Sequence, residues 1–519
     1  MDRRRFLTVS AAALATPSLV GTRAAARSVA GQPLPIPPIL DASGRADAPL
    51  EAIAGTVDFG MGGKAQTLGY SQPYLGPVLR MRRGEIARPV LKNRLDFAVT
   101  AHWHGAHVPG AVDGGPQLAL APGKTWAPEL EIDQPAATLW YHSHIHGETG
   151  PQVYRGLSGM LLIDDPDASN PGLPSTWGID DIPVIIQDRL FDRDGVLAYG
   201  LDMPTMMHGL HGGTILVNGA VQPNASVARG LVRLRLLNAS NARVYTLKFN
   251  DGRGFHQIAS DGGLLPAPLA RDALVLAPAE RAEIVVDLSD GAAVRLVSLP
   301  DTNAAMGGMM RGGMGGMMGG GMGGMMGGGM GGMMGGGMGG MMGGGDSAAP
   351  EAITADGAFG VLDLTPDKAA PAGQALAQSL AGGPTPITGD PVRRRQVALQ
   401  MGPMAMRGSG NPLAINGRAY DMGRIDFDVP RGEVELWEVT SDMMAHPFHV
   451  HGTSFTVLSE NGKTVPFDQM GAKDVLLVDG RAEVIVRFDH GATRETPYMF
   501  HCHILEHEDG GMMGQFTVT

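Results

Sequence analysis

The sequence has almost no cysteine, no long apolar run and no excess of positive charge. Cys502 is the single cysteine among 519 residues, so an internal disulfide is excluded and this thiol is either a buried apolar side chain or a working thiolate. After the N-terminus, no stretch reaches the roughly 20 apolar residues that span a bilayer. The formal charge of -12 argues against a basic surface. We therefore expect neither nucleic acid nor a membrane as a partner.

The N-terminus has the pattern of an export signal. Arg3 and Arg4 are followed by an apolar run and by small residues at Ala24–Ala26, which is typical of the twin-arginine pathway. An ordinary secretory signal or a basic disordered start is the alternative. We assign residues 1–30 to a twin-arginine signal peptide and expect the mature protein in the periplasm. Because this pathway carries folded proteins, it suits a large cofactor protein.

Short β-type runs alternate with Gly and Pro turns in three blocks of the chain. The runs recur at intervals of about ten residues, which is typical of β-sandwiches, and none has the length and period of a bundle helix. We therefore predict an all-β fold with three β-sandwich domains at residues 45–166, 177–365 and 391–519. A linker rich in Ala, Gly and Pro, at residues 366–390, separates the last two.

A stretch of Gly and Met at residues 306–345 interrupts the second block. From Met314 onward, a single Met followed by a Met pair repeats every eight residues, and the stretch holds 15 of the 32 methionines of the chain. Glycine at this density costs too much backbone entropy for the stretch to fold alone. We therefore predict a disordered loop.

Ten of the sixteen histidines fall in four short clusters. Each cluster contains a pair spaced by two residues, and such a pair faces one side of a strand, so it can present two imidazoles to one place. One pair of this kind is weak evidence for a metal, but four pairs divided between the first and third blocks indicate metal sites. The clusters are HWHG (His102, His104), YHSH (His142, His144), HPFHVHG (His446, His449, His451) and HCHILEH (His501, His503, His507).

Cys502 lies between two of these histidines, in the stretch FHCHILEHEDGGMM. If the flanking histidines face one side of a strand, Cys502 faces the other side and reaches a different metal while staying covalently linked to both. A thiolate with two histidines and a weak axial Met is the ligand set of a blue-copper electron-transfer site. Cys502, His507 and Met512 supply three such ligands on one loop, and His446 can supply the fourth. The thiol would then conduct electrons between two sites.

These motifs resemble those of the multicopper oxidases, and most closely those of the bacterial periplasmic copper-efflux (cuprous) oxidases. The resemblance covers essentially the whole mature chain and includes HWHG, VDGGPQ, WYHSH, ASDGGLL, HPFHVHG and HCHILEHEDGGMM. It implies three cupredoxin-like Greek-key domains, with a trinuclear copper cluster between the first and the third.

The resemblance also implies four copper ions with a complete set of ligands. The type 1 copper would take His446, Cys502, His507 and, axially, Met512. The type 2 copper would take His102 and His449, and the two type 3 coppers would take His104, His142 and His503, and His144, His451 and His501. Because no ligand is missing, the copper-free relatives of this fold that serve as structural proteins are disfavoured. The axial Met resembles lower-potential bacterial members more than high-potential fungal laccases.

Two carboxylates match the proton-supplying acids of the family. Reducing dioxygen to two waters needs four electrons and four protons, so acids should lie near the cluster. Asp113 in AVDGGPQ and Glu508 in LEHED are at the matching positions, and a turn or capping role is the alternative for each.

The remaining polar residues near the motifs match no ligand position. We expect three histidines to be structural, namely His107, His146 and His490. Two more, His208 and His211, are expected to bind at most stray copper. The PAERAEIVVDL run, with Glu280, Arg281 and Glu283, is expected to be a sheet edge with a structural ion pair.

The electron donor is predicted from the methionines. Thioethers are soft ligands that select Cu(I), so the Met-rich stretch suggests capture of cuprous ion, with a solvated spacer as the alternative. Asp442 and Met444 match two ligands of the substrate copper in the resembling cuprous oxidases, and Met404 or Met406 are further candidates. The usual Met-rich segment of the third domain is cut here to MGPMAMRGSGN, which also leaves the type 1 site open to bulky phenols.

The sequence therefore predicts a monomeric, exported oxidase that converts Cu(I) to Cu(II), reduces dioxygen to water and serves copper tolerance. A laccase-like phenol oxidase is the alternative among enzymes. A protein that sequesters copper with its Met-rich stretch is the alternative from another class. A nitrite reductase is disfavoured, because eight cluster histidines fit a trinuclear site.

Overall fold

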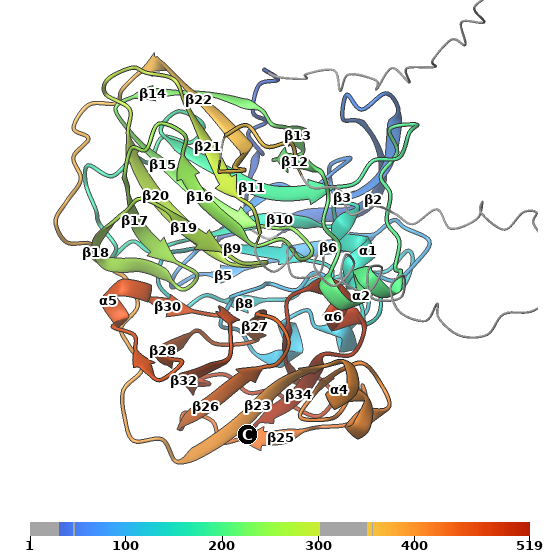
Figure 1. Cartoon of the computed structure of the whole chain (residues 1–519). Helices are drawn as coiled ribbons and strands as arrows, with labels where there is room; N and C mark the ends of the chain where they lie inside the picture. The colour runs from blue at the N-terminus through green and yellow to red at the C-terminus, as the bar shows by residue number, and fades with distance from the viewer. Residues whose placement is uncertain (1–30, 45–46, 302–349, 355) are drawn as a thin grey trace, which may run out of the picture.

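The regular structure of the protein is almost entirely β-strand (Figure 1). The computed structural model describes residues 31–44, 47–301, 350–354 and 356–519. The predicted signal peptide at 1–30 and the Gly/Met stretch at 306–345 lie outside the described residues. None of the described helices is long and apolar enough to cross a membrane. The predicted all-β class is confirmed.

The first group of strands forms sheets in the orders β1-β4-β10-β9, β3-β2-β6-β7 and β5-β8. Its strands are β1 (Ile39–Asp41), β2 (Ala48–Asp58), β3 (Lys64–Tyr70), β4 (Val78–Arg82), β5 (Ile86–Ala87), β6 (Pro89–Asn93), β7 (Thr125–Trp126), β8 (Leu130–Glu131), β9 (Ala137–His142) and β10 (Ser158–Asp164). In β2, the alternate residues Ala48, Leu50 and Ala52 are buried in one core because successive side chains of a strand point to opposite faces.

The second group forms a seven-stranded sheet, β13-β12-β11-β15-β20-β17-β18, and a five-stranded sheet, β14-β22-β21-β16-β19. Its strands are β11 (Asp181–Arg189), β12 (Thr214–Val217), β13 (Ala220–Val221), β14 (Asn224–Arg229), β15 (Leu231–Asn238), β16 (Tyr245–Phe249), β17 (Phe255–Ser260), β18 (Gly263–Arg271), β19 (Leu274–Leu276), β20 (Arg281–Asp287), β21 (Val294–Leu299) and β22 (Phe359–Ala369). Val232, Leu234 and Leu236 of β15 are buried in its core, whereas Arg233 and Arg235 point to the opposite face.

The third group forms a sheet in the order β24-β23-β26-β32-β28-β29, with β30 added to β28, and a five-stranded sheet, β25-β34-β33-β27-β31. Its strands are β23 (Arg393–Met401), β24 (Leu413–Ile415), β25 (Phe427–Val429), β26 (Val434–Ser441), β27 (His446–Val450), β28 (Phe455–Glu460), β29 (Lys463–Thr464), β30 (Ala472–Lys473), β31 (Val475–Val478), β32 (Arg481–Arg487), β33 (Tyr498–Cys502) and β34 (Met513–Val518). β27 and β33 are antiparallel neighbours with His449 opposite His501, so two histidine motifs meet in one sheet.

Short helices connect the strands, and α6 lies against both α1 and α2 (Figure 1). The helices are η1 (Gly110–Val112), η2 (Pro116–Leu118), α1 (Thr149–Tyr154), α2 (Met203–His208), α4 (Gly402–Ser409), α5 (Phe467–Met470) and α6 (Leu505–Asp509). Helix α6 carries His507 and Glu508, so contacts with α1 and α2 fix the position of two residues of the candidate site.

Each group of strands has its own apolar core, and a further core joins all three groups. The joining core contains Trp140 from the first group, Ile185 and Leu237 from the second, and Val475 and Leu505 from the third. Burial of large apolar side chains across these interfaces holds the three parts as one body. Residues from distant parts of the chain can therefore form a site of fixed geometry.

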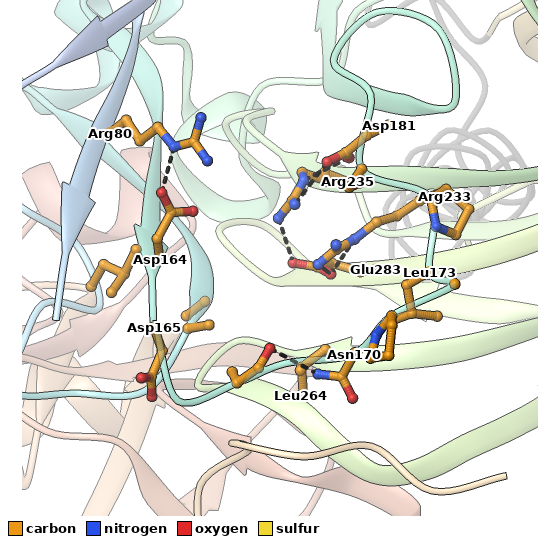
Figure 2. A pocket seen from close by; sticks show the side chains of 18 residues that line it. Arg80, Asp164, Asp165, Asn170, Leu173, Asp181, Arg233, Arg235, Leu264 and Glu283 are labelled. Carbon is orange, nitrogen blue, oxygen red and sulfur yellow. Dashed lines mark hydrogen bonds and ion pairs between the residues drawn. The ribbon is translucent and has the colours of Figure 1, made fainter. Parts of the chain in front are cut away.

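A cavity of about 290 Å³ lies between the first and second groups of strands (Figure 2). Its charged lining residues pair with one another: Arg80 with Asp164, and Arg235 with Glu283 at 3.0 Å. Arg233 also donates to Glu283, at 2.8 Å. Among the described residues, no histidine lines this cavity. Each of these ion pairs lies within one group of strands, and the candidate site lies elsewhere.

The limits of the three domains remain predictions. β1 begins at Ile39, before the predicted limit at residue 45, and β22 runs to Ala369, beyond the predicted limit at residue 365.

Candidate metal centre

Cys502 and two histidines form a compact buried group. The Cys502 Sγ lies 3.4 Å from His446 Nδ1 and 3.6 Å from His507 Nδ1, and these two nitrogens are 3.3 Å apart. All three side chains and that of Met512 are fully buried, and Met512 belongs to the same core cluster as Cys502. A thiol and two imidazoles converging at this distance can bind a soft or borderline metal.

The strand geometry separates this group from the other histidines. Cys502 ends β33, His446 begins β27, and His507 lies on α6. His501, the neighbour of Cys502 in β33, groups instead with His144 and His451. Successive residues of β33 therefore face two different sites, and the backbone between them joins the sites covalently.

Eight further histidines gather between the first and third groups of strands. The ring centroids of His102 and His451 are 3.8 Å apart, and those of His104 and His449 are 3.7 Å apart. The Nε2 atom of His501 lies 3.3 Å from the Nε2 atoms of both His144 and His451. Every member of this histidine cluster is at most 1% exposed: His102, His104, His142, His144, His449, His451, His501 and His503.

Hydrogen bonds to the backbone fix which nitrogen of several rings faces the centre of the cluster. The Nδ1 atoms of His102, His142 and His449 lie 3.0, 2.9 and 2.8 Å from the carbonyl oxygens of Asp113, Ser143 and Asp474, respectively. A carbonyl oxygen can only accept, so each Nδ1 carries the proton and each Nε2 has a lone pair.

Several buried ring nitrogens of the cluster have no hydrogen-bond partner in the described part of the protein. This holds for the Nε2 atoms of His102, His142 and His449, for Nδ1 of His104, and for both ring nitrogens of His503. A buried polar atom without a hydrogen bond costs about 1–3 kcal/mol. So many unpartnered nitrogens pointing into one place fit metal ligands and would be costly without them.

The protonation states also fit metal binding. Burial, followed by the neighbouring imidazoles, lowers the pKa of five cluster histidines well below 6.5, namely His104, His142, His449, His451 and His503. Neutral imidazole is the form that binds metals. Burial also raises the pKa of the Cys502 thiol well above its usual range, so a thiolate at this position requires a bound cation.

Asp113 and Glu508 both face the histidine cluster. The His451 Nδ1–H donates to Asp113 Oδ2 at 2.8 Å, and Asp113 directly follows η1. The Glu508 carboxylate lies 3.2 Å from His501 Nδ1 and 3.4 Å from His144 Nδ1. Both acids are 1% exposed. Both carboxyl groups therefore lie in direct contact with cluster histidines.

The predicted ligand sets and the observed groups overlap to different degrees. Two groups coincide with predicted sets: His446, Cys502 and His507, and His144, His451 and His501. His102 and His449 share a group that also includes His451, and His104 and His142 share one with His102. Among the described groups of closely spaced ligand atoms, none contains His503, although its ring lies 5.1 Å from that of His104.

Exposed methionines lie on α2, which touches the cysteine-containing site, on α4, and shortly before His446 in the sequence. Met203 on α2, Met406 on α4, and Met443 are 61%, 55% and 56% exposed. α2 touches this site, because the carbonyl oxygen of Met207 lies 3.3 Å from His507 Nε2. The predicted pair Asp442 and Met444 lies just before His446, and the backbone N–H of Met401, before α4, donates to Asp442 Oδ1 at 2.8 Å. The side chain of Met404 lies outside the described ones.

Several histidines outside the cluster have protein partners. His107 Nε2 lies 2.9 Å from Ser454 Oγ, His211 Nε2 lies 3.2 Å from Asp301 Oδ2, and His490 Nε2 lies 3.3 Å from Asp133 Oδ2. The ring of His146 packs on Tyr420, and His208 ends α2. These contacts give His107, His146, His211 and His490 structural partners.

The prediction for the PAERAEIVVDL run was wrong in one respect. β20 is not a sheet edge, since it lies between β15 and β17. Arg281, at its start, pairs with Asp474 of the third group of strands, and Asp474 also contacts His104. The sequence reasoning missed Asp474. Its signal was a Lys-Asp pair at the head of the apolar run DVLLV, because buried charges require partners.

Comparisons with known proteins agree with this geometry. Two family models, both described as multicopper oxidase, match residues 53–168 and 391–519. The multicopper oxidase mco of Staphylococcus haemolyticus is 35% identical over 92% of this chain and 90% of its own length. A solved laccase-like multi-copper oxidase CueO from Ochrobactrum sp. is 35% identical, with a TM-score of 0.78 over 94% of this chain and all of that one. The chain belongs to the multicopper oxidase family, and its three-domain cupredoxin-like fold is confirmed.

Other relatives have a different kind of name. The cell division protein FtsP of Edwardsiella tarda is 36% identical over all of this chain and 99% of its own length, and FtsP of Escherichia coli is 35% identical over a similar span. A solved structure from Campylobacter jejuni, described as a metallo-oxidase, is 25% identical with a TM-score of 0.74 over 94% of this chain. The choice between a division role and an oxidase role therefore depends on the residues of this chain.

Proposed function

We propose that the protein is an exported multicopper oxidase that oxidises Cu(I) to Cu(II) and reduces dioxygen to water. The observation that supports this most strongly is the complete ligand set: ten buried histidines and one cysteine form two adjacent groups, and buried ring nitrogens point into them without partners. A chain that only needed the fold would not require these nitrogens in an apolar interior.

The ligands divide as in the resembling family. His446, Cys502, His507 and Met512 would hold the type 1 copper, His102 and His449 the type 2 copper, and the other six histidines the type 3 pair. When bound, copper supplies one-electron transfer at the cysteine-containing site and four-electron reduction of dioxygen at the histidine cluster. The peptide linkage from Cys502 to His501 and His503 provides the path between the two sites.

The chain itself supplies burial and protons. The cluster is sealed from solvent, since its histidines are at most 1% exposed. Asp113 Oδ2 and the Glu508 carboxylate lie beside cluster histidines, so each can hold a proton close to where the oxygen atoms of dioxygen become water.

Cu(I) fits as the electron-donating substrate at the type 1 site. A carboxylate from Asp442 and a thioether from Met444 lie two to four residues before the ligand His446, and α2 and α4 carry further, exposed methionines. Thioethers prefer Cu(I), so they bind the substrate and hold the Cu(II) product less firmly. Four Cu(I) ions, each losing one electron, reduce one dioxygen with four protons to two waters.

The proposal extends to location and assembly. Residues 1–30 direct the folded protein to the periplasm by the twin-arginine pathway, and the mature protein acts as a monomer in copper tolerance. Neither nucleic acid nor a membrane is a partner.

The direct test measures copper content and stoichiometry. The loaded protein should hold about four copper ions and consume one dioxygen for about four Cu(I) ions oxidised. A protein that holds many more Cu(I) ions and consumes no oxygen would instead be a copper store. A protein that retains no copper would refute the oxidase.

A laccase-like phenol oxidase is the second candidate. Two observations favour it: α4, the helix in the shortened segment MGPMAMRGSGN, has only eight residues, and the Ochrobactrum relative is described as active towards lignin model compounds. A division role, suggested by the FtsP relatives, would not need Cys502. In cells that lack the gene, Cys502→Ser should therefore fail to restore copper tolerance. Restoration of normal division by this variant would support the division role.

A further inference from the structure

Five charged side chains from the second and third groups of strands meet behind the histidine cluster. They are Glu280, Arg281, Asp261, Lys473 and Asp474, and together they are called the charge junction here. All are buried, with exposures between 0% and 7%. Lys473 Nζ lies 2.9 Å from both Asp261 Oδ2 and Glu280 Oε1. Two cationic side chains therefore face three carboxyl groups beside the histidine cluster.

Arg281 uses every one of its N–H groups in this junction. Its Nε donates to Thr138 O at 3.3 Å, and its Nη1 donates to Ala279 O at 2.9 Å and to Asp474 Oδ1 at 2.7 Å. Its Nη2 donates to Asp261 O at 3.2 Å and to Asp474 Oδ2. The planar fork therefore connects all three groups of strands, since Thr138 lies on β9, the strand that ends at a cluster histidine.

Asp474, held by Arg281, in turn contacts two cluster histidines. Its Oδ1 lies 3.1 Å from His104 Nε2, and its backbone carbonyl accepts from His449 Nδ1 at 2.8 Å. Because Arg281 donates to both carboxylate oxygens, Asp474 acts as an acceptor and His104 must donate through Nε2–H.

The contact with Asp474 gives His104 the opposite orientation from its neighbours. His102, His142 and His449 donate through Nδ1 and turn Nε2 towards the centre, whereas His104 donates through Nε2 and leaves Nδ1 unpartnered. The other three are fixed by backbone carbonyls, and the carbonyl that accepts from His449 belongs to Asp474 itself. His104 alone among these four depends on a side chain, and that side chain depends on Arg281.

We propose that Arg281, from the group of strands that supplies no copper ligand, is a positioning residue for the histidine cluster. It holds Asp474 so that His104 presents Nδ1 and His449 presents Nε2 to the metal. The inference rests on the proposed function only in that copper occupies the cluster. Loss of such an outer hydrogen-bond partner typically weakens metal binding 10–100-fold.

Arg281→Lys is the sharpest variant to test this. Lysine keeps the positive charge but has three donors on one atom, so it cannot donate to both Asp474 oxygens and to Thr138 at once. Arg395→Lys is the matched control, because Arg395 makes a bidentate pair with the fully buried Glu435, one bond being 2.7 Å. Among the described contacts of Arg395, none involves a cluster histidine.

The measurement is a chelator titration of the copper-loaded protein. It is monitored by the electron paramagnetic resonance signal of the type 2 copper and by the absorbance of the thiolate-bound copper. Arg281→Lys should lose cluster copper at 10–100-fold lower chelator concentration and keep the type 1 absorbance, while Arg395→Lys keeps both. Unchanged cluster affinity in Arg281→Lys would overturn the proposal. Parallel loss of both signals would also overturn it, because it would indicate a general structural role.

A second measurement does not need copper. In the metal-free protein labelled with ¹⁵N-histidine, His104, assigned by loss of its signal in His104→Gln, should be protonated at Nε2 and should lose this single tautomer in Arg281→Lys. Protonation at Nδ1 in the unmodified protein would overturn the inference even if copper binds. Should Arg281→Lys not fold, Asp474→Asn takes its place, because its single carbonyl oxygen cannot accept all three bonds that the Asp474 carboxylate accepts from Arg281 and His104. If no copper binds, the proposed function fails, and the tautomer still decides the inference.

Discussion

Gly105, in the HWHG motif, tests how tightly the charge junction is packed against the histidine cluster. Its φ is +87°, and a Cβ at this position would lie 2.6 Å from Asp474 Oδ2, 2.7 Å from Arg281 Nη2 and 2.8 Å from Leu139 Cδ2. Gly105→Ala therefore has two costs. The left-handed backbone costs about 1–2 kcal/mol for any residue with a Cβ, and forcing an atom into the buried ion pair adds about 1–3 kcal/mol.

Gly84→Ala separates the two costs. Gly84 has a φ of +80°, and a Cβ there would meet nothing within 4 Å, so this variant has only the backbone cost. In urea unfolding of the metal-free protein, Gly105→Ala should be about 1–3 kcal/mol less stable than Gly84→Ala. Gly105→Ala should also release cluster copper more easily. Equal stability and equal copper affinity of the two variants would refute the packing described here.

Three further predictions concern charge, substrate and the Met-rich stretch. Burial alone would raise the pKa of Glu283, but Arg233 and Arg235 outweigh it and lower this pKa to about 2. A carboxylate whose pKa is depressed in the folded state stabilises the fold above its unfolded pKa, and this stabilisation is lost as the pH falls. Glu283→Gln should therefore lower the free energy of unfolding in urea by about 3 kcal/mol at pH 7 and by about 1 kcal/mol at pH 3. A loss that does not change with pH would contradict this. Asp442→Asn should raise the KM for Cu(I) about tenfold and leave that for dimethoxyphenol unchanged, because only the cation loses a charged ligand; steady-state oxygen uptake measures both, and equal shifts would argue against a substrate site. Deleting residues 306–345 should lower kcat/KM for Cu(I) more than for a small phenol, and equal losses would rule out a role in Cu(I) capture.

The copper ligands could be predicted from the sequence because their pattern is local. A spacing of two residues in a strand places side chains on one face, so His501 and His503 on one side and Cys502 on the other follow from neighbouring positions alone. The structure brings His446 to Cys502 through the pairing of β27 with β33, which the sequence motif implies only through the family resemblance.

The charge junction could not be predicted in the same way. Arg281 and Asp474 are 193 positions apart, and their contact depends on how the second and third groups of strands pack together. The wrong prediction of a sheet edge has the same cause. β20 is a central strand because β17 pairs with its second side, and the sequence alone does not show that pairing. Buried charge in an apolar strand is a signal for a partner, but it does not say which partner.

The sequence also could not predict which ring nitrogen of each histidine faces the centre of the cluster. Which atom of His104 faces the centre depends on Asp474, and no spacing rule encodes that choice. The unpartnered nitrogens in the interior are nevertheless what most strongly favours copper over a purely structural role.

The most direct test of the central claim is oxygen uptake by the copper-loaded protein. Chelated Cu(I) is supplied in one experiment, and dimethoxyphenol without added copper in another. We predict fast uptake with Cu(I) and little with the phenol, because the carboxylate and thioethers beside His446 favour cuprous ion. Fast uptake with the phenol and little with Cu(I) would contradict the account and identify a laccase instead.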